Sequence, residues 1–166
     1  MQVIPRWLAR LCQVFGAVGA SIALATGVLT TASVLLRAVW STPVPGDIEM
    51  TQMGVALAIS LCVPYCQLQR ANIIVDFFTQ AASSTTQTRM DALGNLLLVL
   101  LYGLLAWRTS VGAMSVREAG ETTMIISLPM WWAYASLAPG LALAGLIAFM
   151  QGLSGLLNPA AQQEPT

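Results

Sequence analysis

An uncharged stretch near the amino terminus reads LCQVFGAVGASIALATGVLTTASVLL over residues 11–36. Its 26 residues lie between Arg10 and Arg37, and an α-helix needs only about 20 apolar residues to cross a hydrocarbon core of about 30 Å. A cleaved signal peptide is the alternative, because Arg6 and Arg10 precede the stretch and Ala23-Leu24-Ala25 resembles a cleavage site. The apolar stretch is too long for a signal peptide, so we expect an uncleaved spanning helix.

Three further uncharged runs follow along the chain. They contain 20 residues between Glu49 and Arg70, 16 between Asp91 and Arg108, and 42 between Glu121 and Glu164. The runs predict an all-α integral membrane protein with four transmembrane helices in one domain, residues 1–157. We expect these helices at about 11–38, 48–69, 90–114 and 129–153, with a disordered polar tail over 158–166.

The third run is too short to span a membrane by itself. Sixteen residues at 1.5 Å each reach only about 24 Å, so the helix must continue past Arg108 toward Met114. Two interpretations of Arg108 stay open. Its side chain extends to the lipid headgroups beside Trp107, or it faces inward and pairs with a partner subunit or a lipid.

An interfacial amphipathic helix is predicted after the second span, at about 72–86. Ile74, Phe77, Phe78 and Ala81 share one helix face, and polar residues occupy the opposite face. Such a helix lies in the plane of the membrane surface.

Composition narrows the possible functions. Charged residues make up only 8 % of the chain and hydrophobic residues 57 %, and the net charge is zero. This excludes a soluble domain, a disordered chain and a nucleic-acid-binding surface. The chain has no histidine, and it shows neither a phosphate-binding loop nor a nucleophile elbow. We therefore expect a protein that is not an enzyme and binds no cofactor or metal.

Small and aromatic residues mark the expected helices. Gly16, Gly19 and Gly27 in the first helix, and Gly140 and Gly145 in the fourth, are predicted close-packing positions. Pro129 favours a helix start at 128–130, and Pro139-Gly140 predicts a kink. Tryptophans are expected at the membrane interfaces; they are Trp7, Trp40, Trp107, Trp131 and Trp132.

The arginines near the amino terminus predict the orientation. Arg6 and Arg10 favour a cytoplasmic amino terminus by the positive-inside rule. An even number of spans then places the carboxyl terminus in the cytoplasm as well.

Three groups of motifs resemble a known family. Arg37 is followed by PGDIE at 45–49, QLQRANIIVD spans 67–76, and GETT at 120–123 precedes LPMWWAY at 128–134 and Pro139-Gly140. In this order they resemble the small permease subunit (DctQ-like) of tripartite ATP-independent periplasmic (TRAP) transporters. One departure stands at Asn72, where many members carry histidine.

The resemblance implies a function in solute uptake across the bacterial inner (cytoplasmic) membrane. A periplasmic substrate-binding protein (P-type) would deliver an organic acid, a carboxylate or sulfonate, to a large elevator-type membrane subunit (M-type). The small subunit would scaffold that large subunit, and the Na⁺ that drives uptake would bind in the large subunit. Membrane phospholipids are further expected partners.

Two sets of residues are candidate contacts. Candidate contacts to a partner subunit or to the binding protein are Arg37, Asp47, Glu49 and Glu121. Candidate interfacial or lipid contacts are Arg70, Asn72, Asp76, Arg108, Trp131 and Trp132. Helix capping is the alternative for Asp47 and Glu49, and for Arg37 a headgroup contact or an ion pair with either acid stays open.

Two other function classes stay open. A self-contained homo-oligomeric transporter or channel would need polar residues that converge on an axis, and few are present. A redox anchor with a bis-histidine haem conflicts with the absence of histidine.

Overall fold

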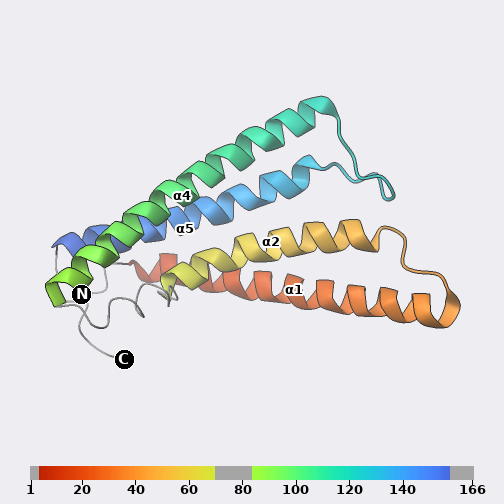
Figure 1. Ribbon diagram of the computed structural model, residues 1–166, viewed down its shortest axis with the longest axis horizontal. Coiled ribbons are helices and arrows are strands. Elements are labelled where there is room, and N and C mark those ends of the chain that lie inside the picture. The colour runs from red at the N-terminus through yellow and green to blue at the C-terminus, as the bar shows by residue number, and fades with distance from the viewer. Residues whose placement is uncertain (1–3, 70–83, 158–166) are drawn as a thin grey trace.

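The computed structural model describes residues 4–69 and 84–157 of the chain. Four helices make up this part: α1 (Arg6–Trp40), α2 (Asp47–Leu68), α4 (Ser84–Ala119) and α5 (Trp131–Leu157), drawn in Figure 1. Each contains a segment long and apolar enough to cross a membrane; in α4 it is Leu93–Ala119 and in α5 Trp131–Ser154. The predicted all-α fold with four spans is thereby confirmed.

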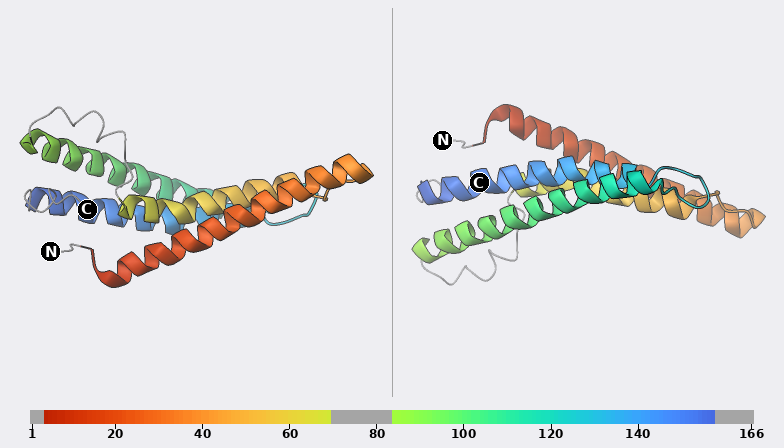
Figure 2. Two further views of the ribbon diagram at one scale, coloured as in Figure 1. Left: turned by 90° about the horizontal axis from the view of Figure 1, so that it is seen from below. Right: turned by 90° about the horizontal axis from the view of Figure 1, so that it is seen from above.

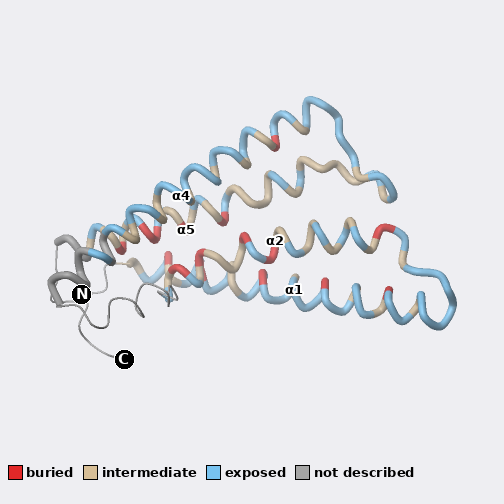
Figure 3. The backbone as a smooth tube through the Cα atoms, in the orientation of Figure 1, coloured by how far each residue is buried: buried red, intermediate tan, exposed pale blue. Residues whose placement is uncertain are grey.

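The main packing contacts join the helices in the order α1, α2, α5 and α4. α1 packs on α2, α2 on α5 and α5 on α4, so α1 and α4 form opposite edges of a layer (Figures 1 and 2). The buried share of the apolar segments is 28 % in α5 and 17 % in α2, but 11 % in α1 and 6 % in α4. Figure 3 accordingly shows long exposed stretches on the two edge helices. The layer therefore carries many apolar side chains that the other described residues do not cover.

The two ends of the layer contain different parts of the chain. α1 begins and α5 ends at one end, which we call the terminal end. The α1–α2 connection and residues 120–130 lie at the opposite end, which we call the loop end. At the terminal end, Leu8 and Cys12 of α1 form a buried cluster with Ile147 of α5.

Glycines set the closest approaches between neighbouring helices. A Cβ atom at Gly19 would lie 2.9 Å from the Ala58 carbonyl oxygen, and one at Gly140 would overlap the Ser60 backbone. Gly16 and Gly145 also face side chains of the next helix, so the sequence prediction is confirmed at these four positions. At Gly27 no contact within the described residues supports it, because a Cβ atom there would meet nothing within 4 Å.

The register of α4 against α5 fixes the depth of their residues. A Cβ atom at Gly152 would touch Asn95, one at Gly145 would touch Tyr102, and one at Gly112 would touch Tyr134. The two residue numbers of these contacts add to nearly the same total, as expected for antiparallel neighbours. Arg108 on α4 is consequently level with Pro139 on α5.

Several boundaries differ from the sequence-based expectation. α4 runs over Ser84–Ala119 rather than about 90–114, so Trp107 lies inside it rather than near its end. α5 begins at Trp131, because the Met130 amide donates to the Glu121 carbonyl across the preceding loop. Residues 84–86 of the expected interfacial helix belong to α4. The remainder of that helix, over 72–83, and the expected tail over 158–166 lie outside the described residues.

Candidate interaction sites at the loop end and in the membrane

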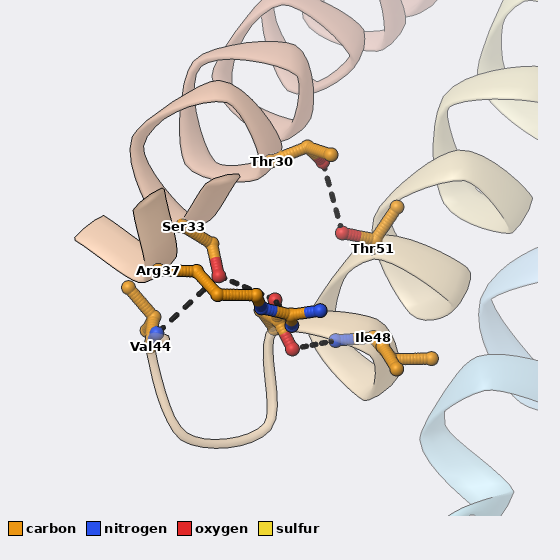
Figure 4. Close-up of polar contacts among 7 residues, drawn as sticks. Thr30, Ser33, Arg37, Val44, Ile48 and Thr51 are labelled. Atoms are coloured by element: carbon orange, nitrogen blue, oxygen red, sulfur yellow. Dashed lines mark hydrogen bonds and ion pairs between the residues drawn. The ribbon is translucent and has the colours of Figure 1, made fainter. Parts of the chain in front are cut away.

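Arg37 and Asp47 meet at the loop end. The Arg37 guanidinium lies 3.6 Å from the Asp47 carboxylate, which confirms the ion-pair alternative for Arg37. Ser33 donates a hydrogen bond to the same carboxylate and accepts one from the Val44 amide, 3.3 Å away. Figure 4 shows Arg37, Ser33 and Val44 gathered between the end of α1 and the start of α2. The cluster closes the short connection between the two helices.

Asp47 does not occupy the N-cap position of α2. That position belongs to Gly46, whose φ of 74° is left-handed and which makes no side-chain capping bond. Asp47 Oδ1 instead accepts from the following amide, Ile48 N, at 2.8 Å. Both acids lie in the first turn of α2, where the helix dipole favours negative charge.

Glu49 binds a loop that is 76 residues distant in the sequence. Its Oε1 accepts from the Ile125 amide at 2.9 Å, and its Oε2 accepts from the Ile126 amide at 3.2 Å. Ile126 also packs against Gly46, where a Cβ atom would lie 2.6 Å from the Ile126 side chain. Glu49 therefore holds the α4–α5 loop against the start of α2.

The α4–α5 loop, residues 120–130, forms a narrow turn. Thr123 N donates to Leu128 O at 2.9 Å, and Thr122 pairs with Pro129 in a single bridge. Glu121 stands at the base of this turn with an exposed side chain. Met124, at the tip, is 98 % exposed, so the loop presents an apolar tip next to a fixed base.

A groove of about 440 Å³ opens between α2, α5 and this loop. Glu49, Gln52 and Thr123 stand in its wall near the loop, and Ala56 and Leu137 stand deeper between the helices. The groove ends where Ser60 donates to the Leu137 carbonyl at 2.8 Å. The groove therefore lies between α2 and α5, beside the α4–α5 loop.

Trp131 and Trp132 begin α5 at the loop end. Their rings stand edge to face with centroids 6.1 Å apart, and the Arg117 guanidinium lies 5.3 Å from the centre of the Trp131 ring. Trp132 is 54 % exposed. This position, at the start of a spanning segment, is typical of residues at the membrane–water interface.

Arg108 lies inside the spanning segment of α4. It follows Leu93 by 15 residues and precedes Ala119 by 11, and its side chain is exposed. None of the residues that the structure describes forms an ion pair or hydrogen bond with it. Arg108 thus differs from Arg37 and Arg117, which have partners within the chain.

Sequence reasoning missed a group of buried amides near the terminal end. Gln67 Nε2 donates to Gln151 Oε1 at 2.8 Å, and Gln151 Nε2 donates to the Gln67 carbonyl at 2.9 Å. Asn95 of α4 accepts from Gln67 at 3.3 Å. Amide side chains inside apolar spans were the available signal, because an unpaired amide is costly there. These bonds connect α2, α4 and α5.

Arg70, Asn72 and Asp76 lie outside the described residues. Within 4–69 and 84–157 there is no group of three or more Cys, Asp or Glu side chains that could hold a metal ion. Cys12 is buried against α5, and Cys62 packs against Gly19.

The fold and the exposed apolar surface together define the class of this protein. It is a multi-pass membrane protein whose four spans form a layer with much exposed apolar surface and little buried core. Residues 26–157 match the family model of tripartite ATP-independent periplasmic transporters, DctQ component, and the chain belongs to this family. No curated protein and no solved structure matches the chain. It is therefore a small component of a TRAP transporter, and its family is one of transporter components rather than enzymes.

Proposed function

We propose that this chain is the scaffold subunit of a Na⁺-coupled TRAP importer. It packs against the large membrane subunit and holds the fixed part of that subunit in the bilayer. The large subunit binds Na⁺ and carries an organic acid, a carboxylate or sulfonate, that a periplasmic binding protein delivers. The complex resides in the bacterial inner membrane, with both termini of this chain in the cytoplasm.

The exposed apolar surface supports the scaffold role above all. The four spans form one layer in which the edge helices bury 11 % and 6 % of their apolar segments. Such apolar faces would be unfavourable in water. In a membrane, lipid or a helix of a partner subunit can cover them at little cost in free energy. When such a layer packs against a neighbouring subunit, it widens the part of the complex that lies in the membrane, and it needs no large hydrophobic core to do so.

The loop end faces the periplasm in this arrangement. Glu121 and the outer side of Arg37, which is 59 % exposed, then remain accessible to the binding protein or the large subunit. The carboxylates of Asp47 and Glu49 already accept hydrogen bonds within the chain. They therefore contribute to this surface chiefly by fixing the positions of the loops. We keep all four residues as proposed partner contacts.

Reconstitution of the large subunit with and without this chain tests the scaffold role. Solute uptake into proteoliposomes under a Na⁺ gradient should require the chain, and affinity capture of the chain should recover the large subunit. Full uptake by the large subunit alone would contradict the proposal. Capture of this chain alone as a defined homo-oligomer, with solute flux of its own, would favour a self-contained transporter or channel instead.

A further inference from the structure

Arg108 places a guanidinium close to the middle of the membrane. Arg117 stacks on Trp131, which begins α5 at the interface. Arg108 precedes Arg117 by nine residues, a distance of about 13 Å along the helix. Half the thickness of a hydrocarbon core is about 15 Å.

A second measure of depth comes from α2. Its uncharged stretch covers the 20 residues between Glu49 and Arg70, and Ser60 is near the middle of it. Ser60 contacts Leu137 and Gly140 of α5, and Arg108 is level with Pro139 between them. Both measures therefore place Arg108 near mid-membrane depth.

The Arg108 side chain points away from the other described helices. Tyr102 faces α5, and Arg108 is about 120° around the helix from it, at 3.6 residues per turn. Leucines at helical spacing share the Arg108 flank, and 49–67 % of their surface is exposed. They are Leu97, Leu101 and Leu104.

We propose that this flank of α4, Leu97 to Arg108, is a docking face for a helix of the membrane partner that carries an Asp or Glu carboxylate opposite Arg108. The proposal rests on the scaffold function above. An isolated charge at this depth is costly, and intramembrane arginines pair with an opposite charge or mark a functional site. The leucines supply the apolar contact of a helix–helix interface, and Arg108 fixes its register.

The described part of the chain offers no such carboxylate. Asp47, Glu49, Glu118 and Glu121 all lie at the loop end, and Asp91 lies 17 residues before Arg108, near the other end of α4. Lipid phosphates fit less well than a carboxylate, because headgroups lie beyond the hydrocarbon core and Arg108 is near its middle. A helix from a neighbouring subunit brings an anion to this depth without thinning the bilayer.

The test measures the affinity between this chain and the membrane protein that co-purifies with it, both held in lipid nanodiscs. Arg108→Glu should weaken binding about thirtyfold or more. The variant removes the ion pair between Arg108 and the partner carboxylate, and it places two carboxylates opposite each other. Arg108→Lys should retain most of the binding. Ser110→Glu is the matched control: it introduces a carboxylate two residues away on the opposite flank and should leave the affinity unchanged.

Photo-crosslinking identifies the occupant of the face. A benzophenone amino acid at position 104 should crosslink to a helix of the membrane partner, and one at position 110 should not. Replacing the acidic residue of that partner helix by lysine should restore binding to the Arg108→Glu chain. Circular dichroism of the variant chain alone should match the wild type, because no bond within the described residues is lost.

Failure of the docking face and failure of the scaffold function would give different results in these experiments. Equal affinity of the Arg108→Glu and wild-type chains, or equal weakening by Ser110→Glu, would overturn the docking face and leave the scaffold function standing. Crosslinks from position 104 to lipid alone, or to a second copy of this chain, would also overturn it. Recovery of no membrane partner by the wild-type chain would overturn both proposals.

Discussion

At the level of Ser60, α2 and α5 approach so closely that Gly140 lies against the Ser60 backbone. The Ser60 hydroxyl donates to the Leu137 carbonyl, so a polar group of α2 is satisfied by the backbone of α5. At the same depth on α4, the Arg108 guanidinium has no partner among the described residues. Within the described residues, polar groups at this depth are hydrogen-bonded where α2 and α5 meet, whereas Arg108 on the outer flank of α4 has no partner.

This contrast separates two kinds of intramembrane surface. The α2–α5 contact is internal, because backbone approach and hydrogen bonds are complete without another molecule. The α4 flank is external, because its charge and its exposed leucines lack a counterpart in the described chain. Substitutions on the two surfaces should therefore affect different properties, internal ones the stability of the chain and external ones its assembly.

The largest expected effect is from Gly140→Leu. A Cβ atom at this position would overlap the Ser60 carbonyl, and a backbone atom cannot move aside as a flexible side chain can. We expect the free energy of unfolding to fall by more than about 3 kcal/mol, at the upper end of what overpacking costs. Reversible unfolding of the purified chain in mild detergent measures this change.

Gly103→Leu is the matched control for Gly140→Leu. Gly103 lies in α4, and a Cβ atom there would meet nothing within 4 Å. Its replacement should leave stability unchanged or raise it slightly, because leucine favours helices over glycine. Equal destabilisation by both substitutions would show that the α2–α5 contact is not the tight internal surface described here.

Arg108→Leu should change membrane insertion rather than folding. An arginine at the centre of a spanning helix costs about 3 kcal/mol on translocon-based scales, and leucine carries no such cost. The Leu93–Ala119 segment should therefore insert more favourably by about 3 kcal/mol in a translocon insertion assay. The same variant should bind its membrane partner more weakly, although its α4 segment inserts into the membrane more favourably.

Arg117→Leu provides the comparison for Arg108→Leu. Arg117 is close to the end of α4 and stacks on Trp131, so its charge lies near the interface, where insertion costs little. A gain in insertion as large as that from Arg108→Leu would contradict the mid-membrane depth of Arg108.

The four spans were predictable because charge alone marks most of their limits. The runs bounded by Arg10 and Arg37, and by Glu49 and Arg70, coincide closely with α1 and α2. The third run needed its length as well, because 16 uncharged residues are too few to span a membrane and the helix had to continue past Arg108. The predicted end at about 114 was nevertheless too early, because α4 continues for 11 residues beyond Arg108. The depth of Arg108 became clear only from the register of α4 against α5.

Contacts between distant segments could not be predicted in this way. Gly27 and Gly140 look alike in the sequence, yet only Gly140 meets a neighbouring helix. The order of the helices in the layer decides this difference, and no local pattern encodes that order. Glu49 likewise has the sequence signature of a first-turn acid, whereas its carboxylate binds amides 76 and 77 residues away.

The smallest effect is expected at Glu49, because only the α4–α5 loop depends on it. In Glu49→Gln one carboxylate oxygen becomes an NH₂ group, so a donor then faces the amide of Ile125 or Ile126. Hydrogen exchange of these two amides should become faster, with little change in the exchange of α5. Glu121→Gln, at an exposed position on the same loop, is the control and should leave their exchange unaltered. Unchanged exchange in Glu49→Gln would mean that the packing of Ile126 on Gly46, rather than the carboxylate, holds the loop. In that case the wall of the groove would persist without the charge.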